Sequence, residues 1–538
     1  LNKINFTVDD LNYTNANGYL KGITNIFVKN LSELPITERP IHCSDRKNWL
    51  GEYDGTLYLD TRKKRVLYQE FIDREMIHFS KYDNDRAIPN VMDGLKMSLR
   101  KIIYSVFKRN LVKEIKVAQL SGYVSEHSGY HHGEMSLNGA IVGMAQTFVG
   151  SNNINLLRPN GQFGTRLQGG KDSASERYIF TQMETLTRAI FKAEDDDILD
   201  YRDDDGQQVE PVYYAPIIPM LLVNGTKGIG TGFSTDVLSY NPLELIDSLT
   251  ERLVLKGKDS DFKWREIHPY YRGFNGTITL LSEGRYLVKG CYQRQSDVKI
   301  HVTELPVGFW TEDFKQHLEN LIDNASKSKA KAKPAPQLIK EYKDMSTDVT
   351  VDFTVTFNSG CLQELENEAY EDGLYNGVDK LLKLYCFQNT SNMNLFDPND
   401  RLKKYLSTNE IMEDFYDKRL ELYEKRRENL IQCKQQQVIL LSNKARYIKE
   451  NLEGTIDLRR KKKDEVTAML LDKQYDKIEE SYQYLIKMPM DSVTEENVAK
   501  LMKEHALHEK ELALLIKTTC YCMWLEDLKY LKGIMMKV

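Results

Sequence analysis

The hydrophobic positions between Asn90 and Arg109 repeat at helical spacing. Steps of three and four place the apolar residues on one face of a helix, and these residues are Val91, Leu95, Leu99, Ile102, Ile103, Val106 and Phe107. Further helices are predicted from about Val117 to Glu126 and from about Gly133 to Phe148. Two short helices joined by a glycine-containing turn are typical of a winged helix, which presents its second helix to a DNA groove. A plain helical bundle is the alternative that this pattern leaves open.

Beyond residue 210 the hydrophobic pattern changes to short alternating runs bounded by turn residues. These strand-like runs are found at 276–280, 298–302 and 349–355, and they predict a mixed α/β domain. Residues 326–336 are low in complexity and rich in lysine, alanine and proline. This composition predicts an exposed, flexible loop within that domain.

From about residue 408 onwards two helical stripes dominate the pattern. The first stripe is formed by Val438, Leu441, Ala445, Ile448 and Leu452, and the second by Val498, Leu501, His505, His508, Leu512 and Leu515. Two such heptad-like stripes, separated by about forty residues, predict a long antiparallel coiled coil. The segment between them, roughly 453–492, is expected to form a globular tip. The two histidines are interpreted as seam residues, because a metal would need more ligands than their vicinity offers.

These patterns predict an α+β multidomain protein. A chain of 538 residues is too long for a single core. We expect an N-terminal connecting segment at 1–45, a helical domain with a small sheet at 46–210, a mixed α/β domain at 211–405 and the coiled coil at 406–538. The chain begins at Leu1 without methionine, which suggests a piece of a longer polypeptide.

Composition narrows the class of protein. A hydrophobic content of 41% and a charged content of 28% are typical of a soluble globular protein with much helix. The most apolar stretch, residues 213–223, is short and contains Pro216 and Pro219, so no membrane association is expected. The seven cysteines lack metal-ligand spacing, and a reduced, intracellular compartment is predicted.

The charge is unevenly distributed along the chain. The formal net charge is −5, but residues 86–178 hold 12 lysines and arginines against 6 aspartates and glutamates. A cationic segment on an acidic body concentrates attraction for phosphate in one place. The segment is therefore a candidate surface for double-stranded DNA.

Tyr178 lies at the end of this segment, in the stretch Gly161-Gln162-Phe163-Gly164-Thr165-Arg166-Leu167-Gln168-Gly169-Gly170-Lys171-Asp172-Ser173-Ala174-Ser175-Glu176-Arg177-Tyr178. A phenol beside a guanidinium is a plausible nucleophile for a phosphodiester, because arginine can bind a phosphate oxygen and stabilise its growing charge. The glycines let the backbone approach a phosphate chain closely. The alternative is a glycine-rich surface loop ending in a strand whose tyrosine packs in a core.

Several further blocks occur around this loop in a fixed order. Together with the Tyr178 loop they resemble the DNA-gate region of type IIA DNA topoisomerases, in their eukaryotic topoisomerase II form. The blocks are Arg86-Ala87-Ile88-Pro89-Asn90-Val91, Asp93-Gly94-Leu95-Lys96, Lys116-Val117-Ala118-Gln119-Leu120, Tyr130-His131-His132-Gly133-Glu134, Phe148-Val149-Gly150-Ser151-Asn152-Asn153, residues 218–225 and Gly228-Ile229-Gly230-Thr231-Gly232. Met97-Ser98-Leu99 and Glu176 depart from the family pattern, which suggests a remote lineage such as a large DNA virus.

The resemblance implies roles for individual residues. The implied catalytic group consists of Tyr178, Arg177, His132 and Arg86. The implied DNA-binding group consists of Lys96, Arg100, Lys101, His131, Gln162, Arg166, Lys171, Lys227 and Ile229. For Ile229 the resemblance implies a wedge between stacked bases that bends the duplex, whereas an apolar residue on a glycine-rich turn is more commonly a core anchor.

Two acidic runs, Asp195-Asp196-Asp197 and Asp203-Asp204-Asp205-Gly206, suggest a metal site at first sight. The resemblance argues against it, because the family binds Mg²⁺ in a separate Toprim domain through a Glu-Gly-Asp motif and an Asp-x-Asp motif. That glutamate motif does not occur in this sequence, and neither does a glycine-rich ATP-binding module. We therefore expect no metal site in this chain, with Mg²⁺ bound by a Toprim domain and ATP used by the full-length enzyme.

The resemblance implies a winged-helix DNA-gate domain, a tower domain and a coiled coil whose tip dimerises. It implies a homodimer that cuts both strands of DNA through a 5′-phosphotyrosine link, passes another duplex and religates the break. A nuclear location is expected for a cellular protein, and the host cytoplasm for one from a large cytoplasmic DNA virus. The alternative is a non-catalytic coiled-coil protein that bends or clamps DNA.

Overall fold

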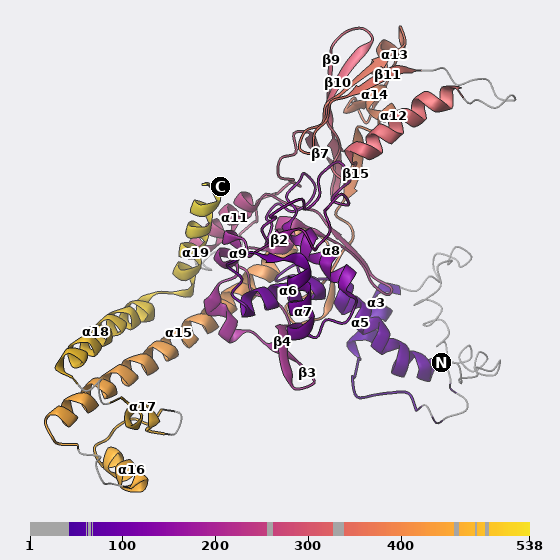
Figure 1. The fold of residues 1–538 in the computed structure, drawn as a ribbon. Coiled ribbons are helices and arrows are strands. Elements are labelled where there is room, and N and C mark those ends of the chain that lie inside the picture. The colour runs from indigo at the N-terminus through magenta and orange to yellow at the C-terminus, as the bar shows by residue number, and fades with distance from the viewer. Residues whose placement is uncertain are drawn as a thin grey trace. The chain divides into compact units, whose positions relative to one another are not determined.

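The structure is a computed structural model that describes residues 42–60, 62, 66, 68–255, 262–326, 338–456, 462–478, 481–489 and 494–537 (Figure 1). The chain divides into two compact units. The first comprises Leu1–Lys192, Leu199–Lys418 and Tyr530–Val538, and the second comprises Ala193–Ile198 and Arg419–Lys529. The N-terminal connecting segment predicted at 1–45 and the low-complexity loop lie almost entirely outside the described residues. Helices and small sheets alternate along the chain, which confirms the predicted α+β class.

The helical part of the first unit contains the predicted helices. Its elements are α3 (His42–Gly51), α4 (Tyr68–Phe71), a π-helical turn (Ile72–Met76), α5 (Ile77–Ala87), α6 (Met97–Lys108), α7 (Val117–Ser128), α8 (Glu134–Ala145) and α9 (Thr185–Ile190). The helix expected from Asn90 begins only at Met97. Asn90 and Asp93 accept backbone N–H groups two residues ahead, at 2.9 and 3.0 Å. Such side-chain turns compete with helix formation and delay its start.

A small sheet accompanies α7 and α8, so this region is not a plain helical bundle. Strand β1 (Ile115–Lys116) pairs antiparallel with β2 (Phe180–Thr181). The turn between the two helices begins at Gly129, which has φ +63°, and a Cβ there would lie 2.3 Å from Asp204 Oδ2. Asp204 belongs to the hairpin of β3 (Tyr201–Asp204) and β4 (Gln207–Pro211). Two helices, a glycine turn and a short sheet give the arrangement expected of a winged helix.

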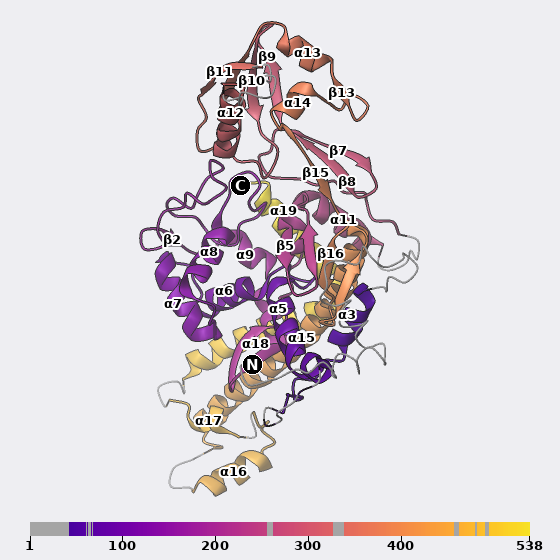
Figure 2. The same ribbon diagram turned by 90° about the vertical axis from the view of Figure 1, so that its right-hand side faces the viewer.

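A second sheet of the first unit carries the glycine-rich turn around Ile229. Its strand order is β17-β16-β6-β5, with β5 (Thr226–Ile229), β6 (Ser234–Val237), β16 (Met393–Phe396) and β17 (Leu402–Tyr405). Helices α10 (Met220–Asn224) and α11 (Pro242–Val254) precede and follow the β5–β6 hairpin. Figure 2 shows this hairpin beside α5. Strands from two distant parts of the sequence thus support the turn.

The predicted mixed α/β region forms two further sheets. One has the order β15-β8-β7, with β7 (Thr277–Ser282), β8 (Arg285–Lys289) and β15 (Tyr385–Asn389). The other has the order β11-β12-β10-β9, with β9 (Cys291–Arg294), β10 (Lys299–Glu304), β11 (Ile339–Asp344) and β12 (Phe353–Phe357). The remaining elements are α12 (Thr311–Ser326), α13 (Cys361–Asn367), β13 (Ala369–Tyr370), β14 (Tyr375–Asn376) and α14 (Gly377–Leu381).

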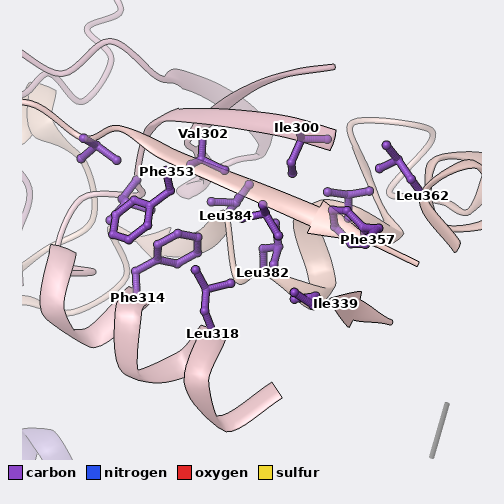
Figure 3. Packing of buried hydrophobic residues seen from close by; sticks show 14 residues of the cluster. Ile300, Val302, Phe314, Leu318, Ile339, Phe353, Phe357, Leu362, Leu382 and Leu384 are labelled. Carbon is purple, nitrogen blue, oxygen red and sulfur yellow. The ribbon is translucent and has the colours of Figure 1, made fainter. Parts of the chain in front are cut away.

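A compact apolar core joins α12 to the second of these sheets (Figure 3). Phe314 and Leu318 on one face of α12 are fully buried, as is Phe353 on β12. The rings of Phe314 and Phe353 meet edge to face at a centroid distance of 4.9 Å. Burial of such side chains contributes about 2–3 kcal/mol each, so this region has a core of its own.

In the second unit two long helices run antiparallel. They belong to α15 (Thr408–Leu452) and α18 (Glu495–Lys517). Arg427 donates to the carbonyl of Thr518 at 2.8 Å, while Lys434, two turns further along, pairs with Glu511 at 2.7 Å. Rising numbers on one helix meet falling numbers on the other, which confirms the predicted antiparallel pairing. On α18 the stripe Val498, Leu501, His505, His508, Leu512 and Leu515 is half-buried.

Between these helices the second unit forms a separate packed module. It contains α16 (Lys463–Asp472) and α17 (Gln483–Ile486). Its cluster of buried residues comprises Tyr447, Ile456, Val466, Leu470, Tyr475, Tyr482 and Leu485. The predicted globular tip is therefore present in the described part of 453–492. The C-terminal helix is α19 (Cys520–Met535). Among the described residues, no helix is both long and apolar enough to cross a membrane.

Candidate active site

Tyr178 projects into solvent from a fixed backbone position. Its side chain is 77% exposed, whereas the next residue, Ile179, is 2% exposed and anchors the chain in the core. The first backbone N–H groups of α7 donate to the carbonyls of Ile179 and Glu176, at 3.1 and 3.2 Å. These N–H groups have no partner within their own helix, so the loop satisfies them and is held in return. The alternative reading, a tyrosine packed in a core, is excluded.

The glycine-rich loop before Tyr178 is folded back on itself. Asp172 accepts hydrogen bonds from the backbone N–H of Thr165 at 2.9 Å and from its hydroxyl at 2.6 Å. Gln146, which directly follows α8, donates to the carbonyl of Phe163 at 2.9 Å. Gly170 has φ +83°, and a Cβ there would stand 2.3 Å from Gln146 Nε2. Only glycine suits this position, where the backbone turns and approaches α8 closely.

A groove runs between α8 and the loop. It has a volume of about 430 Å³, and its lining includes Glu134 and Met135 at the start of α8 and Ala174 and Arg177 from the loop. The exposed Arg177 guanidinium therefore lies on the same surface as the N-terminal end of α8. That helix follows His132 by two residues, so the loop and the histidine segment border one site.

His131 and His132 form a cluster with two tyrosines and with Arg86. Tyr82 Oη is in contact with His132 Nε2 and lies 3.2 Å from His131 Nε2. The Tyr130 ring meets His132 edge to face at 5.5 Å. The pKa of His132 is lowered, first by burial and then by the charges of Arg86, His131 and Lys101. At neutral pH His132 is therefore an uncharged imidazole that can accept a proton.

Three of the predicted DNA-binding cations are buried in ion pairs of the free protein. Arg100 binds Asp93 through two nitrogens at 2.7 and 3.0 Å. Lys101 pairs with Glu210 at 2.8 Å, and Arg166 is bonded to Glu304. All three cations are less than a tenth exposed. Because a buried charge separated from its partner is costly, we assign these residues a structural role and leave them out of the proposed contact surface.

The other predicted DNA-binding residues lie at the surface. Lys171, Gln162, His131 and Lys227 are exposed. Lys96 is half-buried and donates to the carbonyl of Lys227 at 2.5 Å, and its pKa is lowered by burial. The start of α6 and the β5–β6 hairpin are therefore joined at Lys96.

Ile229 is an exposed apolar side chain at the end of β5. It is 84% exposed and pairs with Ser234 of β6. Its neighbours Gly228 and Gly230 face α5, where a Cβ would stand 2.2 Å from the Ala87 oxygen and 2.4 Å from Asn84 Oδ1. Since side chains alternate along a strand, Ile229 points away from α5. The core-anchor alternative is excluded for the free protein.

The acidic runs have structural partners. Asp195 is buried in the second unit and accepts from Arg419 at 2.6 Å, and Asp203 accepts the N–H of Gly206 at 2.8 Å in the β3–β4 turn. In the part of the chain that the structure describes, no group of three or more histidines, cysteines, aspartates and glutamates is placed to hold a metal ion. The described donor set therefore does not fit a Mg²⁺ site.

Tyr82 is the site residue that the sequence analysis missed. It lies 50 residues before His132 in the chain, so no local motif contains both. The signal was the spacing of Phe79, Tyr82 and Arg86, which places two exposed aromatic rings and a cation along one face of α5.

These features define a DNA-cleavage region of the type IIA class. A family model for DNA gyrase/topoisomerase IV matches residues 86–529. A second, described as the C-terminal associated domain of TOPRIM, matches residues 40–84. The chain belongs to the DNA gyrase/topoisomerase IV family, which confirms the resemblance. The second match crosses the boundary predicted near residue 45, and the domain boundaries stay predictions.

The individual relatives are eukaryotic and viral topoisomerases. DNA topoisomerase 2 of Arabidopsis thaliana is 40% identical over 93% of this chain and 35% of its own length. The DNA topoisomerase 2 of Acanthamoeba polyphaga mimivirus is 37% identical over 90% of this chain and 42% of its own length. The crystal structure of the Plasmodium falciparum topoisomerase II DNA-binding, cleavage and re-ligation domain matches with a TM-score of 0.83 and 36% identity, over 98% of this chain and 70% of that one. The chain thus spans well under half the length of these curated relatives.

Proposed function

We propose that this chain is the DNA gate of a type IIA topoisomerase and that Tyr178 is its nucleophile. The observation that carries the proposal is the exposed phenol of Tyr178, held beside the exposed guanidinium of Arg177 at the end of a rigid glycine-rich loop. A phenol fixed at the surface can reach a phosphodiester of bound duplex DNA. Similarity to a DNA-binding, cleavage and re-ligation domain supports this reaction.

The proposed reaction is a reversible transfer of a phosphoryl group. Tyr178 Oη attacks phosphorus and forms an O–P bond, while the bond from phosphorus to the 3′-oxygen breaks. The phenol proton is lost, the 3′-oxygen gains a proton, and the products are a 5′-phosphotyrosine and a free 3′-hydroxyl. One phosphodiester replaces another, so religation needs no ATP. Two protomers acting on opposite strands would open a duplex for passage of a second one.

The neighbouring groups suit the charge changes of this reaction. Arg177 and Arg86 are exposed cations that can neutralise the non-bridging phosphate oxygens as charge builds up on them. His132 is held neutral by burial and by nearby cations, so it can accept the phenol proton. Lys96, Lys171, Lys227, His131 and Gln162 are the proposed contacts to the DNA backbone.

The exposed Ile229 supports a role in bending DNA. A solvent-facing isoleucine fixed on a glycine-flanked hairpin is suited to enter between stacked bases. Insertion of such a wedge costs a few kcal/mol of unstacking, which the additional contacts of a bent duplex offset.

Dimerisation, cofactors and location are part of the proposal. We propose a homodimer in which the tip of the coiled coil joins the protomers, with Mg²⁺ held by a Toprim domain and ATP used by a further domain of the complete enzyme. Magnesium would help to stabilise charge on the reacting phosphate. An intracellular location follows from the DNA substrate, in the nucleus of a cell or in the cytoplasm of a virus-infected host.

The deciding experiment is capture of a covalent protein–DNA adduct by Tyr178→Phe and wild-type enzyme carrying the Toprim and ATPase regions. The variant keeps the ring but loses the nucleophilic oxygen, so we expect no adduct and no relaxation, with DNA affinity unchanged. Tyr58→Phe is the matched control, because Tyr58 is another exposed tyrosine, at 67%. Adducts formed by Tyr178→Phe would refute the assignment. Absence of adducts in the wild type as well would favour the alternative, a DNA-bending or clamping protein.

A further inference from the structure

Tyr82 connects α5 to both histidines of the site. Its ring stacks on His131 at a centroid distance of 6.4 Å and lies 5.6 Å from the ring of His132. Its hydroxyl reaches Nε2 of both imidazoles. Burial raises the pKa of Tyr82, so its hydroxyl keeps its proton at neutral pH.

The direction of these hydrogen bonds follows from one backbone carbonyl. His131 Nδ1 lies 3.1 Å from the oxygen of Gly129, which can only accept, so Nδ1 carries the proton of a neutral ring. His131 Nε2 is then an acceptor and takes the hydroxyl proton of Tyr82. The oxygen of Tyr82 in turn has lone pairs for the N–H of His132 Nε2. The order of donation is His132 to Tyr82 to His131 to Gly129.

This order fixes the protonation of His132. With its proton on Nε2, the neutral ring has its free lone pair on Nδ1. Among the described residues, none is hydrogen-bonded to that nitrogen. Arg86 from α5 and Lys101 from α6 are the cations that act on this ring, together with His131, and all three disfavour a second proton.

We propose that Tyr82 is a positioning residue that holds His132 through Nε2 and leaves Nδ1 as the proton acceptor of the site. This inference rests on the proposed function, since the proton to be accepted is that of Tyr178. Tyr82 touches neither the nucleophile nor phosphate in this role. Its contribution passes entirely through His132, which makes the effects of the two residues non-additive.

A double-mutant cycle tests the proposal, with single-turnover adduct formation measured in the enzyme that carries the Toprim and ATPase regions. Tyr82→Phe keeps the ring and removes the hydroxyl, and we expect adduct formation to slow about three- to tenfold, as for loss of one hydrogen bond. In a His132→Gln background the same substitution should have no further effect. A slowing of equal size in both backgrounds would show a merely structural role and overturn the proposal.

Two controls separate this inference from the proposed function. Tyr130→Phe should form adducts at the wild-type rate, because Tyr130 meets His132 through the edge of its ring. Tyr178→Phe should form none. If Tyr178→Phe is inactive but Tyr82→Phe reacts at the wild-type rate, the role of Tyr82 is refuted and the proposed function stands. If Tyr178→Phe still forms adducts, the proposed function itself is wrong.

Discussion

Gly228 lies so close to Ala87 that a Cβ at position 228 would stand 2.2 Å from the Ala87 carbonyl oxygen. The β5–β6 hairpin is therefore seated directly on α5, whose last turn carries Arg86. This contact sets the direction of Ile229, which alternates to the opposite face of the strand. The hairpin and the candidate catalytic cluster share one supporting helix.

We expect Ile229→Ala to reduce DNA bending and cleavage while leaving thermal stability nearly unchanged. Truncation of an 84% exposed side chain leaves no cavity, so the change in unfolding free energy should stay within about 0.5 kcal/mol. Fluorescence energy transfer between the ends of a short duplex, measured beside a melting curve, tests this. Unchanged bending would remove Ile229 from the DNA site.

Gly228→Ala is the matched substitution on the other face of the same strand. The added methyl group has no room beside the Ala87 carbonyl, so the hairpin must move away from α5. We expect a lower melting temperature together with weaker bending, in contrast to Ile229→Ala. A variant with wild-type stability would show that the contact yields without cost.

Arg166→Ala and Lys171→Ala should act on different properties, although both cations lie in one loop. Arg166 is buried against Glu304, and loss of one partner of a buried ion pair costs about 3–5 kcal/mol. Lys171 is exposed, and its removal should weaken DNA binding and lower its salt dependence without affecting stability. Denaturant unfolding and DNA titrations at several salt concentrations distinguish the two. Equal stability of both variants would contradict the structural role of Arg166.

The adduct-forming rate should depend on the protonation of His132. Burial and nearby cations lower the pKa of His132, so the neutral, proton-accepting form prevails at pH 7 and above. On acidification below about pH 6.5, the usual value for histidine, the ring gains a proton and the rate should fall. The His132→Gln enzyme should be slow throughout and lack this acidic limb. Persistence of the limb in that variant would assign it to another group.

The tip of the coiled coil should hold two protomers together. Replacement of residues 453–494 by a short glycine-containing linker removes the module around α16 and α17 and leaves the paired helices of α15 and α18. We expect a dimer for the intact chain and weaker association for the variant by sedimentation at micromolar concentration, with DNA binding preserved. Exposed Leu471 on α16 is a candidate contact residue. A monomeric intact chain would refute the proposed interface.

The sequence alone determined the elements and the nucleophile loop. Apolar residues at spacings of three and four fix which face of α6 and α18 is buried, because that periodicity is local. The short runs that became β7, β10 and β12 were recognisable for the same reason. Tyr178 was found because its glycines, cations and phenol lie together in one stretch of chain.

The tertiary structure decided which charged residues face DNA and which support the fold. Arg166 and Glu304 are 138 residues apart, and Lys101 and Glu210 are 109 residues apart. No local pattern reports such pairs, so the sequence presented the cations as free for phosphate. The contact of Tyr82 with His132 likewise depends on the packing of α5 beside the turn that follows α7. Charge and hydrogen bonding act through space, whereas sequence patterns describe neighbours along the chain.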